Sequence, residues 1–404
     1  MEATQTLQFD IMVAGGGVAG CAAALQAARQ GKQVVLVEKA VQLGGLATTG
    51  IVNLFEPMCN GRGTQIIKGM AQEFLDLARR YGWDDLPAEW QQGEPGQGNT
   101  NRRLICHYSA PIFALALCKL LSDAGVTLMF DTVVTDVEAR KGHIYSATVF
   151  NKSGYTRLCA GMYIDTTGDA DLLHYAGVPT AKQGNYHTYA GYGLNLDTCQ
   201  KAVENRDVGK LYFDIPGGNA SRTGKNHPEG MPLWDGTDGE QVSRYFQTNQ
   251  LEVLSRIQND DRKSRDIVML PAMHQFRTTR HIIGNHVLQK EDVFRHFEDS
   301  VGAIGDCMSR DAIYEVPYGT LVRDDWDNIL TAGRSAAAEG YAWEVLRVIP
   351  PAILTGQAAG LAAAMALDAG CPISQVEISP LQKALAATGV IIHFDDALIP
   401  PETK

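Results

Sequence analysis

The sequence of 404 residues lacks several features that would each identify a class of protein. None of its eight cysteines are spaced C-x-x-C, which excludes the common dithiol redox pair and the common zinc and iron–sulfur motifs. Acidic residues outnumber basic ones, and the net charge of −11 argues against general binding to nucleic acid or to anionic membranes. A local basic pocket for a small anion is compatible with that charge.

Targeting signals and long hydrophobic runs are also missing. The N-terminus has no basic stretch followed by an apolar core, so no secretory signal is predicted. The most apolar C-terminal stretch, at 350–370, is rich in alanine and glycine and has no run of strongly apolar residues typical of a membrane span. Scattered cysteines in such a chain are typical of reduced thiols, and we expect a cytoplasmic protein.

What the sequence does contain, at its N-terminus, is a glycine-rich turn between two apolar segments. The run FDIMVA at 9–14 stops at glycine and predicts a buried strand. The alanine-rich stretch from Val18 predicts a helix that stops at Gly31, and QVVLVEK at 33–39 predicts a second buried strand. The sequence therefore predicts a βαβ unit.

The turn carries a G-x-G-x-x-G frame, formed by Gly15, Gly17 and Gly20. The first glycine permits a tight turn, the second lets the backbone approach a pyrophosphate, and the third lets helix pack on strand. Free N–H groups at Val18 and Ala19 can bind phosphates. Glu38 follows Gly20 by 18 residues, where a carboxylate can accept both ribose hydroxyls. This order predicts a dinucleotide site and leaves NAD and FAD open; the alternative is a glycine turn without nucleotide.

Three further glycine segments follow predicted core strands at distant points of the chain. They are LGGLATTG at 43–50, IDTTGDADLLHYAGV at 164–178 and DNILTAGRSAAA at 327–338. An extended ligand that crosses several strand ends would need such distant segments, whereas NAD confined to one compact domain would not. This distribution favours FAD.

The remaining patterns predict an α/β fold. Helical periodicity marks 66–81, 110–124 and a long helix from about Pro351, and Ser379, Pro380 and Gln382 predict the capped start of a last helix. Short β-branched runs between 126 and 169 predict an antiparallel meander that returns to the parallel sheet. Residues from about 180 to 315 are richer in Tyr, His and Asn and predict a second, inserted domain.

Several segments together resemble one known family. The chain is similar to the flavoproteins of the glutathione reductase/fumarate reductase superfamily and, more narrowly, to the single-FAD "FAD-dependent oxidoreductase" family. The matching segments are GGGVAG…VEK…GG, YIDTTGDAD…AGV, RTTRHIIGNHVL, VPYGTL, NILTAGR and TGQAAGLAAAMA. The resemblance covers nearly the whole chain. It implies a Rossmann-like FAD-binding domain at 1–178 and 316–404, with an α+β substrate or cap domain inserted at 179–315.

The resemblance also implies FAD as cofactor and a set of contacts with it. Glu38, Lys39 and Val134 would meet the adenosine, and the pyrophosphate would meet Gly15, Gly17, Val18, Ala19, Gly20, Thr167, Gly168 and Asp169. The ribityl chain and flavin would meet Gly45, Leu46, Ala47, Gly333, Arg334 and Gly356. The helix that contains Gly356 would direct its dipole at the flavin and stabilise negative charge on the reduced ring. For Gly356 and Gly360, close helix packing is the alternative reading.

Candidate catalytic residues lie further along the chain. In HQFRTTRHIIGNH at 274–286, Arg277 and Arg280 could clamp a carboxylate or other anion, and His281 could pass protons near neutral pH. The alternative is an arginine pair that holds the two domains together. Tyr318 could direct its hydroxyl at the flavin, or be a core aromatic. No metal site is predicted.

These patterns predict an enzyme in which flavin and substrate exchange hydride directly. No second G-x-G-x-x-G occurs between 180 and 315, so a built-in NAD(P)H domain is not expected. The expected partners are a small polar organic substrate and a separate electron acceptor or donor, with no nucleic acid and no membrane. The alternatives are a biosynthetic enzyme on a flavin scaffold, as in relatives of thiazole synthase, and an electron-relay or assembly subunit that needs a partner protein.

Overall fold

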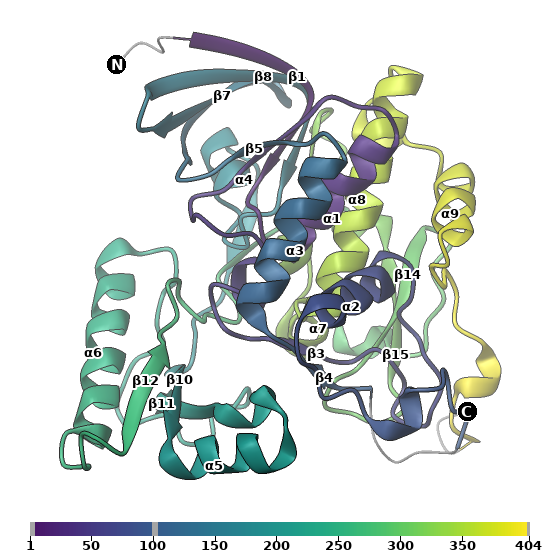
Figure 1. Ribbon diagram of the computed structural model, residues 1–404. Coiled ribbons are helices and arrows are strands. Elements are labelled where there is room, and N and C mark those ends of the chain that lie inside the picture. The colour runs from purple at the N-terminus through teal and green to yellow at the C-terminus, as the bar shows by residue number, and fades with distance from the viewer. Residues whose placement is uncertain (1–4, 99–103, 402–404) are drawn as a thin grey trace.

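The computed structural model describes residues 5–98 and 104–401, and its centre is a seven-stranded sheet (Figure 1). The parallel part contains β5 (Thr127–Met129), β2 (Val34–Val37), β1 (Gln5–Ala14), β8 (Gly154–Asp165) and β16 (Ile329–Thr331). Beyond β8, β7 (His143–Asn151) and β6 (Val133–Arg140) add antiparallel neighbours. The predicted α/β fold with a parallel sheet and a meander is confirmed, except that β5 pairs in parallel with β2 rather than within the meander.

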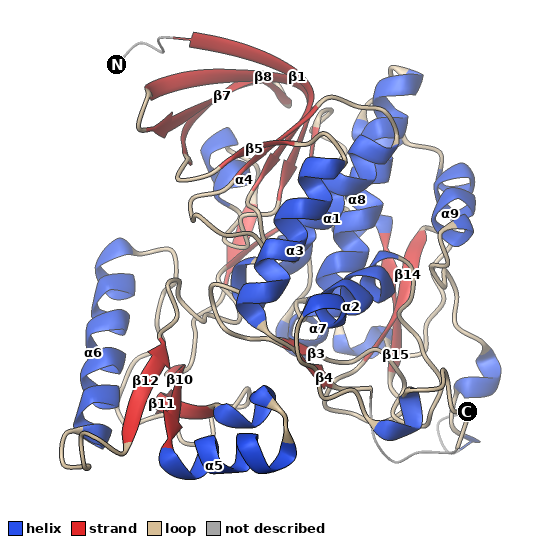
Figure 2. Cartoon of the chain, viewed as in Figure 1, coloured by secondary structure: helices blue, strands red, loops and turns tan. Residues whose placement is uncertain are grey.

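The strands alternate their side chains between two helical layers. Ile11 and Val13 face the core that contains α1 (Val18–Arg29), α3 (Ala110–Asp123) and α8 (Ile349–Ala369). Met12 and Ala14 face the opposite core, which includes residues of α4 (Asp171–Ala176). Figure 2 shows α1, α3 and α8 together on one side of the sheet. Both faces are therefore covered, as a parallel sheet requires.

Helix α8 is buried along most of its length. By length and composition it could cross a membrane, but 78% of its most apolar window is buried inside the protein, as in the core helix of a globular fold. It packs closely on α1 because two glycines face that helix. A Cβ atom on Gly356 would lie 2.2 Å from the carbonyl oxygen of Ala19, and one on Gly360 would lie 2.2 Å from that of Ala23. Close packing is thus the observed role of both glycines.

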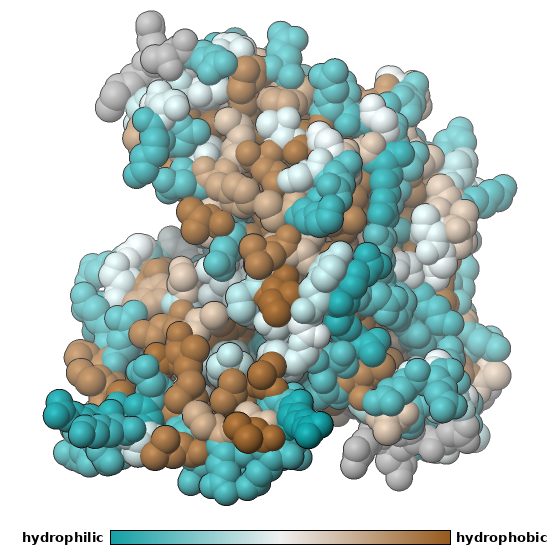
Figure 3. Space-filling view, in the orientation of Figure 1, coloured by the Kyte–Doolittle hydropathy of each residue, from teal (hydrophilic) through white to brown (hydrophobic). Residues whose placement is uncertain are grey.

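A smaller unit lies beside the main sheet and has its own sheet and core. Its strand order is β11 (Phe213–Asn219), β10 (Thr188–Asn195) and β12 (Arg265–Met269), flanked by α5 (Leu196–Asn205) and α6 (Gly239–Ile257). Its core cluster contains Tyr189, Trp234, Tyr245 and Phe276. In Figure 3 this unit is at the lower left, and the surface is indented between it and the upper part of the molecule.

The ends of the predicted inserted domain belong structurally to the connection and to the main core. β9 (Thr180–Lys182) pairs with β13 (Arg280–Ile282) where the chain leaves and re-enters the main part. β14 (Ser300–Gly305) and β15 (Ile313–Pro317) pair with each other, and their residues Val301, Ile304 and Val316 join the main core cluster. The domain limits at 179 and 315 stay a prediction.

The peripheral elements complete the main part. They are β3 (Leu54–Phe55) with β4 (Cys106–His107), α2 (Met70–Tyr81), α7 (Gly340–Leu346) and α9 (Ile378–Ala387). The predicted cap of the last helix is wrong. α9 has Glu377 as N-cap without a side-chain hydrogen bond, and the Gln382 amide donates to the carbonyls of Glu298 and Ser300 instead of closing a capping box.

The contact between α1 and α8 gives a stability prediction. Gly360→Ala adds a Cβ atom where the Ala23 carbonyl lies, so the helices must separate, and we expect the free energy of unfolding to fall by about 1–3 kcal/mol. Gly239→Ala is the matched control, because no atom lies within 4 Å of the Cβ position there. Urea unfolding followed by circular dichroism measures both. Equal stabilities for the two variants would contradict the close contact.

Candidate functional site

A cavity of about 560 Å³ lies where the parallel strands end. Sheet register brings Val37, Ala14, Asp165 and Thr331 side by side at the ends of four strands. The residues that follow them, Glu38, Gly15, Thr166 and Ala332, all line the cavity. Ligands of open α/β sheets bind at this edge, and the volume is typical of a cofactor site.

The glycine turn forms an open cradle at this edge. Gly15 has a φ of +100°, and a Cβ atom there would lie 2.4 Å from the carbonyl oxygen of Thr166. A Cβ on Gly20 would overlap the Gly15 carbonyl, whereas one on Gly17 would meet nothing within 4 Å and would fill the cradle itself. Gly17 is the N-cap of α1 and no side chain caps that helix. The donor set fits the phosphates of a dinucleotide.

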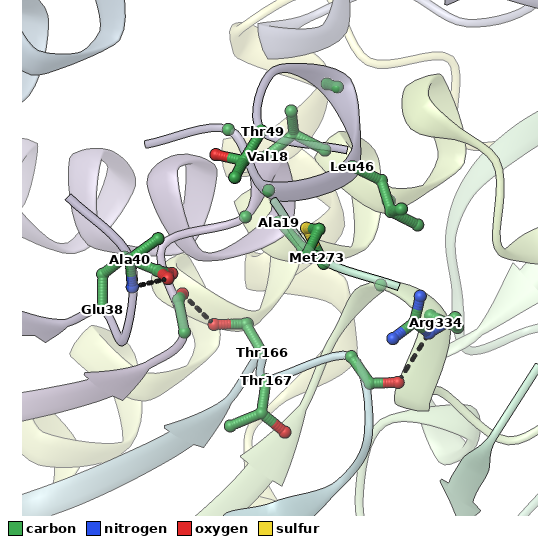
Figure 4. Close-up of a pocket in the computed structure, with 18 of the residues that line it drawn as sticks. Val18, Ala19, Glu38, Ala40, Leu46, Thr49, Thr166, Thr167, Met273 and Arg334 are labelled. Atoms are coloured by element: carbon green, nitrogen blue, oxygen red, sulfur yellow. Dashed lines mark hydrogen bonds between the residues drawn. The ribbon is translucent and has the colours of Figure 1, made fainter. Parts of the chain in front are cut away.

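Glu38 supports the turn and borders the cavity. Its side chain accepts a hydrogen bond from the backbone N–H of Gly16, at 2.6 Å. It accepts a second from that of Ala40, at 2.7 Å (Figure 4). An ionised carboxylate has about four lone-pair sites, so these two bonds leave acceptor capacity toward the cavity. Lys39 and Val134 line the same end.

A buried ion pair holds the part of the wall formed by the loops after β8 and β16. Arg334 lies in the turn after β16 and donates to the Asp169 carboxylate at 2.6 Å, to the Gly168 carbonyl at 2.7 Å and to the Phe276 carbonyl at 2.8 Å. Burial alone would raise the pKa of Asp169, but the neighbouring His274, Arg334 and Lys39 outweigh it and hold that pKa far below its usual range. Asp169 is therefore a carboxylate at every ordinary pH.

Asp165, the last residue of β8, orders the loop that leads to this pair. Its carboxylate accepts bonds from the N–H and hydroxyl of Thr167 and from the N–H of Leu173, at 2.8–2.9 Å. Burial raises the pKa of Asp165 to about 6.

Two buried polar atoms on the cavity wall have no hydrogen-bond partner among the described residues. They are the hydroxyl oxygen of Thr49 and Nδ1 of His274. The other ring nitrogen of His274 lies 3.2 Å from Asp169. Buried polar groups are nearly always hydrogen-bonded, so both atoms indicate a polar ligand in the cavity.

A pair of arginines lines the end of the cavity away from Glu38. Arg347 directly precedes the N-cap of α8 and forms an ion pair with Glu344; the two side chains are 11% and 14% exposed. Arg222 reaches the cavity from the loop after β11, donates to the Cys307 sulfur and lies 3.9 Å from Glu56. One arginine comes from the main part and the other from the smaller unit, so both units build this end.

Arg277 belongs to the same charged cluster, although it does not line the cavity. Its guanidinium donates two long bonds, both 3.4 Å, to the Ala220 carbonyl. Burial and the nearby positive charge of Arg347 lower the pKa of Arg277 to about 10. No carboxylate of the described residues lies within ion-pair distance of Arg277. The cluster therefore holds positive charge that its acids do not fully match.

Most of the predicted cofactor contacts lie on the cavity wall. These are Gly15, Gly17, Val18, Ala19, Glu38, Lys39, Gly45, Leu46, Ala47, Val134, Thr167, Gly168, Gly333 and Arg334. Gly20 packs behind the turn, Asp169 holds Arg334, and Gly356 packs on α1, so these three act from behind the wall. Ile349 and Ala352 are the residues of α8 that reach the cavity.

The predicted catalytic residues are not brought to the cavity wall. Arg280 lies in the short strand β13 and pairs with Asp171 at 3.4 Å. His281 bonds the Ile282 carbonyl, packs edge-on against Trp343, and has its pKa lowered by burial. A spacing of three fits a shared helical face or a single turn, but Arg277 lies at a bend and Arg280 begins strand β13. The guanidinium of Arg277 bonds the Ala220 carbonyl and that of Arg280 pairs with Asp171, so the two residues do not form a clamp.

Tyr318 is a core aromatic. It is 3% exposed, and its hydroxyl donates to the Ile373 carbonyl at 2.7 Å. Burial raises its pKa well above the usual range. The expectation that this hydroxyl faces the cavity is wrong, because the chain after β15 turns it into the core.

The wall residues that the sequence patterns did not indicate include Thr49, Arg222, His274 and Arg347. Thr49 lies in the glycine segment at 43–50 and His274 begins the polar cluster at 274–286, so both lie within segments that the sequence marks as functional. Arg222 and Arg347 are 125 positions apart and carry no joint signal in the sequence. Only the packing of the smaller unit on the main part brings them to one cavity.

The comparisons with known proteins agree with this architecture. The sequence model of a family described as "FAD dependent oxidoreductase" matches residues 10–190 and 218–385. The residues left out between these ranges lie in the smaller unit and include α5. No curated protein matches the chain in sequence.

Solved structures share the fold at low sequence identity. The p-nitrophenol 4-monooxygenase of Pseudomonas putida DLL-E4 is 12% identical, with a TM-score of 0.50, over 98% of this chain and 91% of that one. A geranylgeranyl bacteriochlorophyll reductase-like protein of Thermoplasma acidophilum is 13% identical, with a TM-score of 0.48, over 97% of this chain and 95% of that one. At such identities the likeness concerns the fold alone.

The buried ion pair gives the prediction for this site. Arg334→Ala leaves Asp169 as a buried charge that has lost its main partner, and we expect the free energy of unfolding to fall by about 3–5 kcal/mol. Arg29→Ala, which removes the exposed pair with Glu73, should cost no more than about 1 kcal/mol. Guanidinium unfolding of cofactor-free protein measures both values. A cost for Arg334→Ala as small as that of the control would refute its structural role.

Proposed function

The chain belongs to the FAD-dependent oxidoreductase family, and from that premise we propose that it exchanges hydride between its FAD and a small polar organic substrate that carries an anionic group. The family membership makes the chain an FAD-dependent oxidoreductase. The proposal concerns the reaction at the flavin and the class of substrate. The observation that carries it is the composition of the cavity, whose glycine cradle and arginine pair lie on one continuous wall.

The cofactor residues divide along the cavity. We assign the adenosine to the end with Glu38, Lys39 and Val134, and the pyrophosphate to the open N-terminus of α1 at Gly17. Glu38 can accept ribose hydroxyls with the lone pairs that Gly16 and Ala40 leave free. Thr49 and His274 would supply hydrogen bonds to the polar atoms of the cofactor, which satisfies both unpartnered atoms.

The bound FAD supplies two-electron chemistry at its ring system, and the protein determines which molecules can reach that ring. Leu46, Ala47 and Ile349 line the middle of the wall, and the N-terminus of α8 opens there with its positive dipole end. The same helix end is preceded by Arg347, so the reactive region and the arginine pair are neighbours along the chain. We therefore propose that the substrate binds at the arginine end.

At that end Arg222 and Arg347 can hold a substrate anion. Glu344 fixes the orientation of Arg347, because its carboxylate accepts hydrogen bonds from Nε and one terminal nitrogen of the guanidinium. Arg222 faces it from the other unit, where Glu56 at 3.9 Å is only a loose counter-ion. Arg277 adds positive charge from behind without a carboxylate of its own. A guanidinium pair binds planar anions such as carboxylates with well-defined geometry, so it orients the substrate as well as attracting it.

The roles first assigned to Arg277, Arg280, His281 and Tyr318 change accordingly. Their contacts favour structural roles. Arg277 adds positive charge behind the arginine pair, and Tyr318 fills the core. Arg280 and His281 hold the connection between the two units in place. A proton-transfer role for His281 stays a prediction, as does a separate electron acceptor or donor.

The test uses the purified FAD-loaded chain under anaerobic conditions. Small 2-hydroxy and saturated carboxylic acids, each paired with its primary amide, are titrated while the flavin absorbance is recorded. We expect acids, and not amides, to perturb the spectrum, and the acid of the right carbon skeleton to bleach it. Arg222→Ala should weaken the perturbation by about 10- to 100-fold in apparent affinity, which corresponds to one charge-assisted hydrogen bond.

The control is Arg244→Ala, which removes an exposed arginine from α6 in the same unit. It should keep wild-type affinity and the same FAD content. Equal responses to acids and amides would contradict the anionic substrate, and an Arg222→Ala variant that binds acids normally would remove that residue from the site. Flavin that responds only after a protein partner is added would favour the electron-relay reading instead.

A further inference from the structure

We propose that His296, Glu315 and His393 form a binding site for a divalent transition-metal ion of the zinc class, separate from the FAD cavity. None of the three residues lines that cavity. They come from three places in the chain: the loop before β14, the middle of β15 and the segment after α9. The proposal does not depend on the proposed function.

The donor atoms already converge. His296 Nδ1 lies 2.5 Å from one carboxylate oxygen of Glu315, and His393 Nδ1 lies 3.0 Å from the other. One ligand atom from each of the three residues lies within 4.8 Å of the others. Zinc binds nitrogen and oxygen ligands at about 2.0–2.2 Å, so small side-chain rotations would place all three around one ion.

The partners of these ligands match those of metal-bound histidine. His296 Nε2 lies 2.9 Å from the Asp396 carboxylate, and the Phe297 N–H donates to Glu315 at 2.8 Å. A histidine that donates its Nε2–H to a carboxylate leaves the lone pair of Nδ1 for a metal ion. Here that lone pair faces a carboxylate oxygen, and two acceptors at such a distance need a proton or a metal ion between them.

The burial of Glu315 is a second reason to infer a metal ion at this site. The Glu315 side chain is fully buried, and among the described residues it bonds the Phe297 N–H and the two imidazoles. A buried carboxylate needs compensating positive charge, and a divalent ion held between Glu315 and the two imidazoles supplies it. The histidine side chains are 42% and 46% exposed, so an ion can enter from solvent and keep water as a further ligand.

The ligand set selects the class of ion. Two imidazole nitrogens and one carboxylate suit Zn²⁺ and its neighbours in the first transition row, whereas Mg²⁺ and Ca²⁺ prefer oxygen ligands throughout. The ion would fasten the C-terminal segment to the hairpin of β14 and β15. Phe394 and Ile399 of that segment already pack on Ile313, and the His296 ring stacks on Phe394 at 4.3 Å. The expected role is structural.

The test titrates chelator-treated, tag-free full-length protein with ZnCl₂ by calorimetry and with CoCl₂ by visible absorption. We expect one ion per chain, a higher unfolding midpoint with zinc, and cobalt d–d bands without a sulfur-to-cobalt charge-transfer band. His393→Ala should abolish this binding. Asp396→Asn, which alters only the partner of His296, should weaken it by about 10- to 100-fold.

The matched control is His143→Ala, because His143 is similarly exposed and its Nδ1 lies 2.8 Å from the Asp327 carboxylate outside the site. It should bind zinc as the wild type does. FAD content of each variant reports whether the fold is intact. The proposal is overturned if zinc shows no saturable binding, if His393→Ala binds it normally, or if the cobalt spectrum shows thiolate ligands.

Discussion

The cavity depends on the buried ion pair between Arg334 and Asp169. Arg334 also bonds the Gly168 and Phe276 carbonyls, and Asp169 also meets His274. One guanidinium thereby joins the turn after β16, the loop after β8 and the segment that returns from the smaller unit. Because both charges are taken out of water, neither partner can be lost without leaving the other uncompensated. The part of the cavity wall that these three segments form therefore keeps its shape.

Much of the fold could be predicted because it is encoded locally. The order of apolar run, glycine turn, alanine-rich helix and second apolar run specified β1, α1 and β2 within a few residues. The glycine segments at 43–50, 164–178 and 327–338 could be assigned to one ligand because register places the ends of their strands side by side. Local signals fail for Arg277 and Arg280, because a spacing of three fits a helical face or a turn and does not fix where the two side chains point. Arg277 lies at a bend and Arg280 in strand β13.

The substrate end could not be predicted, for a different physical reason. Arg222 and Arg347 meet through the packing of separate units, and each alone looks like an ordinary surface arginine. The same holds for His296, Glu315 and His393, whose donor atoms converge only in three dimensions. The cofactor end thus depends on short sequence motifs, whereas the proposed substrate end and the proposed metal site depend on tertiary contacts.

The central claim is that FAD lies along this cavity with its ring system at the arginine end, and a crystal structure of the FAD complex tests it most directly. The account predicts adenine beside Val134, ribose hydroxyls on Glu38, the pyrophosphate at Gly17, and the ring between Leu46 and Ile349 with its open side toward Arg222 and Arg347. A ring system found at the Glu38 end, or a pyrophosphate away from the N-terminus of α1, would contradict it.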